Sequence, residues 1–143
     1  MNLPFFYDIC DRIGLMVMDE AFDGWARKAE HDYGAQAFAQ WWEKDLRAFI
    51  RRDRNHPSVV VWSVGNETKG DVAHDLVRVC HEEDPTRAVT SGHSGSEFMD
   101  VFGVNGHSER QNFFTPFKPG GKAFVGTETP HTWQVRGFYR TKT

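Results

Sequence analysis

Two glutamates stand at the ends of predicted strands, where a pair of carboxyl groups could cleave a glycosidic bond. Glu67 follows the β-branched run 58–64, directly behind Asn66, and Glu128 follows the apolar run 123–126. A carboxyl group kept protonated at neutral pH can donate a proton to the leaving oxygen, while an ionised one attacks the anomeric carbon. Either glutamate taken alone is explained as an acidic residue that meets solvent where a strand ends. Together, on neighbouring strand ends, they suit the separation of roughly 5–5.5 Å that a retaining mechanism needs.

Helices and strands that alternate along the chain would position these side chains. Apolar spacing predicts helices over residues 4–12, 36–54 and 71–83, and strands over residues 15–18, 58–64, 88–90, 101–104 and 123–126. This alternation implies right-handed crossovers and a parallel α/β sheet, either open and doubly wound or closed into a (β/α)₈ TIM barrel. No G-x-G-x-x-G follows a strand and the sequence has no Walker loop, so the nucleotide-binding open sheet loses support.

The position of the polar residues favours the barrel. Asp19-Glu20, Asn66-Glu67 and Thr127-Glu128 all lie at the carboxyl ends of predicted strands, where barrels place their active sites. A complete barrel typically needs about 250 residues, and this chain has 143 with about five strands. We therefore expect one domain over residues 1–143 that is an incomplete barrel, holding about strands 3 to 7.

Three segments then give a resemblance to glycoside hydrolase family 2, which includes β-galactosidases, β-glucuronidases and β-mannosidases. Residues 6–23 resemble the helix and third strand of its catalytic barrel, and residues 53–67 (DRNHPSVVVWSVGNE) resemble its fourth-strand acid/base motif. Residues 126–129 (GTET), followed by Arg136-Gly137 and Tyr139, are similar to the seventh-strand nucleophile segment of its β-galactosidase-like members.

The resemblance implies a role for each matching residue. Glu67 would be the acid/base, Glu128 the nucleophile, and Asn66 the partner of the sugar 2-hydroxyl. Asp19 and Glu20 would line the floor or wall of the site, although a polar strand end bonded to a neighbouring loop or arginine explains them equally. The other predicted substrate-binding residues are Trp25, His93, Asn105 and Trp133.

Tryptophan rings can stack on the apolar face of a sugar. Trp25 and Trp133 follow strand ends and are our candidates for this role, whereas Trp42 and Trp62 lie on a helix stripe and inside a strand and are expected in the core. Cys10 and Cys80 are likewise expected as small buried apolar residues.

The sequence departs from the family at two places. Gly106 follows Asn105 where the family usually has a tyrosine that touches the nucleophile. Gly24-Trp25-Ala26 replace the Glu-x-His of the magnesium-dependent β-galactosidases, so we expect no metal, and the two carboxylates require no cofactor.

Composition limits the partners. The 17 Lys and Arg against 20 Asp and Glu give a net charge of −3, which argues against nucleic acid. No apolar run reaches the roughly 20 residues that would span a membrane. We therefore expect a retaining, β-galactosidase-type segment that acts on terminal β-linked sugars within a larger enzyme, partnered by the missing barrel strands and β-sandwich domains. The alternatives are a catalytically silent fragment that only binds carbohydrate or packs against those domains, and an unrelated open α/β binding protein.

Overall fold

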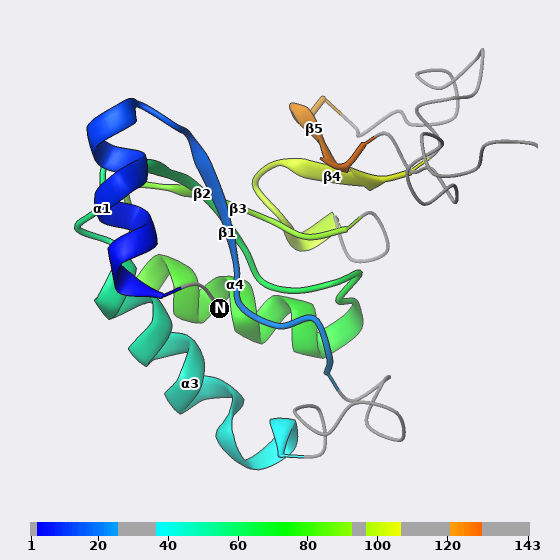
Figure 1. The fold of residues 1–143 in the computed structure, drawn as a ribbon. Helices are drawn as coiled ribbons and strands as arrows, with labels where there is room; N and C mark the ends of the chain where they lie inside the picture. Colours follow the sequence, from blue (N-terminus) through cyan, green and yellow to red (C-terminus); the bar gives the residue numbers. More distant parts are fainter. Residues whose placement is uncertain (1–2, 26–36, 93–96, 107–120, 130–143) are drawn as a thin grey trace, which may run out of the picture.

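The computed structural model describes residues 3–25, 37–92, 97–106 and 121–129, which form an alternating series of helices and strands (Figure 1). No helix in these ranges is long and apolar enough to cross a membrane. In chain order the elements are α1 (Pro4–Ile13), β1 (Val17–Glu20), α3 (Phe38–Asp53), β2 (Val59–Ser63), α4 (Gly70–Glu83), β3 (Ala88–Thr90), β4 (Phe102–Asn105) and β5 (Phe124–Glu128). The predicted order of elements is confirmed.

Three strands, β1, β4 and β5, end later than the sequence predicts. Asp19 and Glu20 are the last residues of β1, paired with Trp62 and Ser63 of β2, and Glu128 is the last residue of β5, paired with Asn105 of β4. The ladder continues through these polar residues because each has a neighbouring strand to bond with, which local apolarity does not reveal.

All the strand pairs are parallel. β1, β2 and β3 form one sheet in chain order, and β4 pairs with β5 in a second. The two sheets meet where the N–H groups of Asp100 and Val101 donate to the Val89 carbonyl and the Thr90 hydroxyl donates to the Val101 carbonyl. Neighbouring strands that follow chain order are the arrangement of a barrel wall, but the described strands do not close into a barrel.

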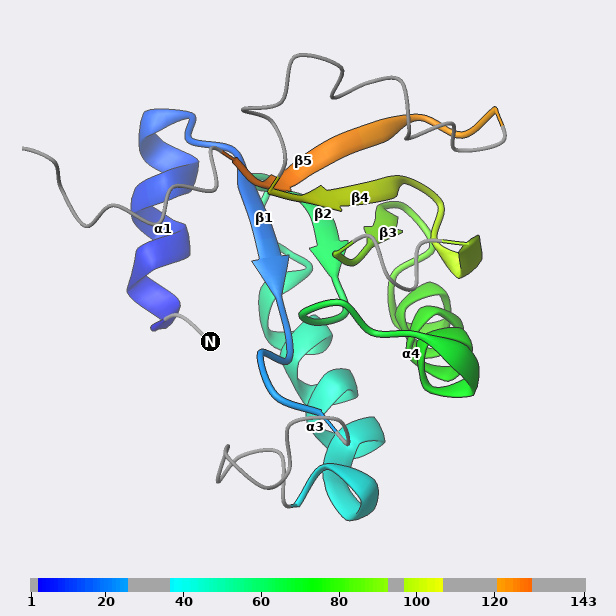
Figure 2. The same ribbon diagram turned by 90° about the vertical axis from the view of Figure 1, so that its right-hand side faces the viewer.

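Helices α1, α3 and α4 lie on one side of the three-stranded sheet, and β4–β5 lie on the other (Figures 1 and 2). The core forms between the sheet and these helices. Trp62 of β2 is 1% exposed, its ring meets Phe49 edge-on at 5.6 Å, and its indole N–H donates to Asp84 at 3.0 Å. The expectations that Trp62, Cys10 and Cys80 are buried are confirmed, and Trp42 packs partly buried against the same core.

Helix α1 exposes much of the apolar stripe that its sequence shows. Phe5, Ile9 and Ile13 are 60%, 40% and 68% exposed, while Tyr7 and Cys10 are buried. The helix turns Tyr7 inward because its hydroxyl donates to the buried Asp19 carboxylate at 2.8 Å. The outward stripe is therefore an apolar surface that nothing in the described residues covers.

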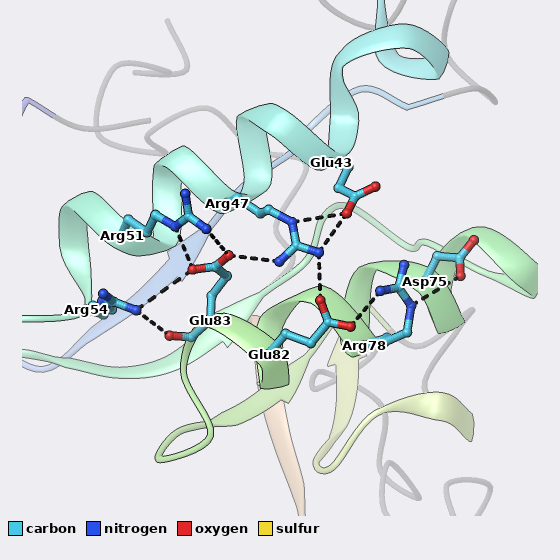
Figure 3. Close-up of polar contacts among 8 residues, drawn as sticks. All are labelled: Glu43, Arg47, Arg51, Arg54, Asp75, Arg78, Glu82 and Glu83. Carbon is cyan, nitrogen blue, oxygen red and sulfur yellow. Dashed lines mark hydrogen bonds and ion pairs between the residues drawn. The ribbon is translucent and has the colours of Figure 1, made fainter.

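Charged residues join α3 to α4 on the outer surface (Figure 3). Glu83 is 7% exposed and accepts hydrogen bonds from Arg47 at 2.8 Å and Arg51 at 2.7 Å. Arg47 also reaches Glu82 at 2.6 Å, and Arg54 donates to the Glu83 carbonyl at 2.7 Å. The hydrogen bonds from Arg51 and then Arg47 lower the pKa of Glu83 to about 2 against the desolvation that opposes them.

Candidate active site

The turn after β2 carries Glu67 in an unusual backbone conformation. Gly65 has φ 148°, and a Cβ there would lie 2.6 Å from the Phe22 carbonyl oxygen, so glycine lets the turn pass close to the segment after β1. Glu67 itself has φ 55°, a left-handed value that few non-glycine residues adopt. Ser91 supports this turn, because its hydroxyl donates to the Gly65 carbonyl at 2.8 Å and accepts from the Thr68 N–H at 3.1 Å.

Glu67 lies beside the end of β4. A Cβ on Gly92 would sit 2.8 Å from Glu67 Cγ and 2.6 Å from Asn105 Nδ2, so both side chains converge on the space that glycine leaves open. Asn105 Nδ2 in turn donates to Glu128 Oε1 at 3.1 Å. The fold thus brings both predicted catalytic glutamates to the same end of the sheets, where Glu67 and Asn105 face Gly92 and Asn105 bonds to Glu128.

Asn66 is held by the segment that follows β1. Its N–H donates to the Phe22 carbonyl at 2.9 Å, and its side-chain amide donates to Asp23 Oδ1 at 3.1 Å. Trp25 donates its indole N–H to the Asn66 carbonyl at 2.9 Å. Sequence reasoning missed Asp23, because its place past the end of the strand does not show that its side chain turns toward Asn66.

Trp25 lies in the core. Its side chain is only 5% exposed, so in this structure it holds the backbone of Asn66 and does not present an open ring face for a sugar. The stacking expectation for Trp25 therefore finds no support in its position. His93 and Trp133, the other two residues expected near the sugar, lie outside the described residues.

Asp19 and Glu20 point to opposite faces of β1, as successive strand residues do. Glu20 is exposed and accepts a hydrogen bond from the Ser63 hydroxyl at 2.7 Å. Asp19 is 2% exposed and turned toward the helices, where Tyr7 donates to it. Because Asp19 faces the helices, its predicted place in the site wall is corrected. Among the described residues it is a buried carboxylate bonded to Tyr7 of α1, and not to a loop or an arginine as the alternative had it.

Burial changes the acidity of the Tyr7–Asp19 pair. Desolvation raises the pKa of Asp19 to about 6, although the Tyr7 hydrogen bond opposes the rise. Desolvation and the neighbouring Asp19 carboxylate also raise the pKa of Tyr7. These shifts belong to the layer between α1, β1 and α3 and not to the strand ends that carry the glutamates.

One group among the described residues could offer three ligands to a cation: Asp8, Asp11 and His56. Asp11 already accepts hydrogen bonds from His56 Nδ1 at 2.7 Å and from the Ser58 N–H at 2.9 Å. Hydrogen bonds from Ser58 and then from His56 lower the pKa of the Asp11 carboxyl against the desolvation that opposes them. These contacts hold α1 to the start of β2, at the opposite end of that strand from Glu67.

Comparison with known proteins decides the family. Residues 2–113 match the sequence profile described as glycosyl hydrolases family 2, TIM barrel domain. The chain belongs to this family. The matched region includes Glu67, Asn66 and Asn105 but ends before Glu128.

Individual relatives agree with this assignment. The chain is 58% identical over 140 residues, 98% of its length, to a putative β-glucuronidase of Formosa agariphila, and 36% identical over 190 aligned positions, 96% of its length, to the β-galactosidase BoGH2A of Bacteroides ovatus. A crystal structure of a β-glycosidase from Bacteroides vulgatus matches 94% of the chain at 43% identity with a TM-score of 0.81. The chain spans 13%, 22% and 18% of these three proteins, so it corresponds to a part of a barrel domain within much longer glycosidases.

Proposed function

We propose that this chain supplies the acid/base, Glu67, and the nucleophile, Glu128, of a retaining β-glycosidase of β-galactosidase type. The observation that carries the proposal is the position of Asn105, whose amide faces Gly92, as the Glu67 side chain does, and donates to Glu128 at 3.1 Å. Two glutamates at one end of parallel strands, one of them bonded to a buried amide, fit the two-carboxylate arrangement of glycoside hydrolysis.

The proposed reaction has two steps. Glu128 attacks the anomeric carbon while Glu67 protonates the leaving oxygen, which gives a covalent glycosyl-enzyme. Glu67 then removes a proton from water as that water attacks the intermediate, and Glu128 departs. Asn66 is the proposed partner of the sugar 2-hydroxyl, and Asp23 orients its amide for that bond.

The proposed substrate is a terminal β-linked sugar, with a β-galactoside as the first choice. The relatives above are named as a β-galactosidase, a putative β-glucuronidase and a β-glycosidase, so a substrate panel must hold both neutral and acidic sugars. The proposed partners are the remaining barrel strands and the β-sandwich domains of a longer enzyme. The exposed stripe of Phe5, Ile9 and Ile13 on α1 is the kind of surface that such neighbours would cover.

The test uses this chain in place of the matching segment of the Formosa agariphila relative. In that chimera, Glu128→Ala should abolish turnover of every aryl β-glycoside, because no leaving group replaces the nucleophile. Glu67→Ala should keep the first step for a dinitrophenyl glycoside, whose leaving group needs no proton, and should slow the second. Nitrophenyl β-galactoside and β-glucuronide, each assayed with the unsubstituted chimera, identify the sugar.

Added azide separates the two roles by product stereochemistry. It should rescue Glu67→Ala by attacking the covalent intermediate, giving a β-glycosyl azide. With Glu128→Ala it should enter from the vacated nucleophile side and give an α-azide or nothing. Identical azides from the two variants, or the two stereochemistries reversed, would show that the roles are wrongly assigned. An unsubstituted chimera that folds but has no activity would favour the alternative of a silent segment.

A further inference from the structure

Asn105 has the contacts of a residue that holds a catalytic group. It is the last residue of β4, pairs in register with Glu128 of β5, and is only 6% exposed. Its Nδ2 donates to Glu128 Oε1 at 3.1 Å. A side chain so deeply buried offers little surface to a sugar, but its amide is already bonded to the carboxylate.

Thr127 sets the direction in which that amide points. The Thr127 hydroxyl donates to Asn105 Oδ1, which leaves Nδ2 as the end that faces Glu128. The reverse orientation would set Oδ1 against a carboxylate oxygen, and these are two acceptors with no proton between them. Thr127 and Glu128 are adjacent on β5, so the same strand that carries the carboxylate also orients its donor.

The backbone confines Asn105 from two further sides. The Gly106 N–H donates to the Glu128 carbonyl at 2.9 Å, which ties the end of β4 to the end of β5. A Cβ on Gly92 would lie 2.6 Å from Nδ2, so the amide fits closely against a backbone that carries no side chain there. Gly106 has no side chain, so its bond to Glu128 is made by the backbone, and the Asn105 amide is the described side-chain group of β4 that bonds to the Glu128 carboxylate.

We propose that Asn105 is a positioning residue, oriented by Thr127, that holds the Glu128 carboxylate in line for attack and is not a ligand of the sugar. This role rests on the proposed function, in which Glu128 is the nucleophile. The hydrogen bond itself is independent of that function, so the two ideas can fail separately.

The first measurement uses the 143-residue chain and the NMR signals of the Asn105 side-chain amide. One amide proton should resonate downfield of a solvated asparagine, because it is bonded to a carboxylate. Glu128→Ala should remove that shift, and Thr127→Val should reduce it, while Thr127→Ser, which keeps the hydroxyl, should preserve it. Thr129→Val is the matched control, since the Thr129 side chain lies over Gly126 and not on Asn105. If the chemical shift of the Asn105 side-chain amide does not change in Glu128→Ala, the proposal is overturned.

The second measurement uses the chimera described above, so that the proposal stays open to refutation even if the separate chain gives poor spectra. Asn105→Ala and Thr127→Val should lower kcat by about ten- to hundredfold with KM changed less than about twofold, because a misplaced nucleophile slows chemistry without weakening binding. Thr127→Ser should restore most of the rate. A raised KM with unchanged kcat would make Asn105 a sugar ligand and overturn the proposal. A Glu128→Ala chimera that stays active would instead refute the proposed function.

Discussion

Replacing Asp19 by asparagine should stabilise the protein at neutral pH. Asp19 is 2% exposed, and its Oδ2 has no hydrogen-bond partner among the described residues. Asp53, which is fully buried, faces the same space from α3 and raises the pKa of Asp19, while Arg52 makes its two hydrogen bonds to Asp53. From α1 only the Tyr7 hydroxyl bonds to Asp19. An ionised Asp19 is therefore a buried charge with incomplete compensation.

The size of the effect follows from the pKa. The pKa of Asp19 rises from its ordinary value of 3.8 to about 6 in the folded chain. A group whose pKa is raised by folding contributes stability that is present below the unfolded value and lost as pH rises through the folded one. A pKa difference of this size corresponds to about 3 kcal/mol at most, and residual solvent screening reduces it. We therefore expect the free energy of unfolding to fall by about 1–3 kcal/mol between pH 4 and pH 7.

The assay is urea unfolding followed by tryptophan fluorescence at several pH values from 4 to 7.5. Asp19→Asn keeps an acceptor for Tyr7 and offers an amide proton toward Asp53, so the variant should match the unsubstituted chain near pH 4 and exceed it by about 1–3 kcal/mol at pH 7. Asp45→Asn, on the exposed face of α3, is the matched control and should follow the unsubstituted chain throughout. Parallel pH profiles for the Asp19 variant and the unsubstituted chain would refute the reasoning.

Three further outcomes are expected. Gly92→Ala should cost about 1–3 kcal/mol in urea unfolding and lower kcat in the chimera, because its Cβ would lie 2.8 Å from Glu67 Cγ; unchanged kinetics would contradict the proximity of these groups. Glu83→Gln should lower the free energy of unfolding at pH 7 by about 1 kcal/mol. The difference between the variant and the unsubstituted chain should narrow as pH falls from 4.5 toward about 2, because the arginine-bonded carboxylate loses its charge in that range, and a difference that widens in acid would contradict this. The 143-residue chain assayed alone should hydrolyse nitrophenyl β-galactoside orders of magnitude more slowly than the roughly 1–10³ s⁻¹ typical of enzymes, because the exposed Glu128 lacks a closed site. A rate typical of whole enzymes would disprove this prediction.

Local pattern was enough to predict the elements, because a buried strand and an amphipathic helix each need a particular spacing of apolar residues. The run 58–64 became the central strand β2, and the helix predicted over 71–83 became α4. The motif ending in Asn66-Glu67 was enough to predict the family, and the match of residues 2–113 to the family profile confirms it. The roles of Glu67 and Glu128 stay predictions that rest on that resemblance and on their proximity in the fold.

The inner and outer sides of each element were decided by tertiary contacts. The apolar spacing of α1 indicates a face with Phe5, Phe6, Ile9, Cys10 and Ile13. Of these the fold buries Cys10 and leaves Phe5, Ile9 and Ile13 exposed, and it also buries Tyr7, whose hydroxyl meets a carboxylate that comes from β1. Asp19 reads as a strand-end residue like Glu20, but the pleat turns it to the opposite face. Neither outcome follows from spacing alone, since both depend on which element is packed behind the helix or strand.

The sequence by itself determined the alternating α/β order, the family and the candidates for catalysis, because these depend on residue type and short-range spacing. The tertiary structure decided which of those residues meet. Asp23 reaches Asn66 from the segment after β1, and Asn105 bonds to Glu128 while its amide fits against Gly92, which Glu67 also faces. Such side-chain contacts depend on strand register and on the paths of turns that are far apart in the chain. A pattern of residues along the sequence contains neither kind of information.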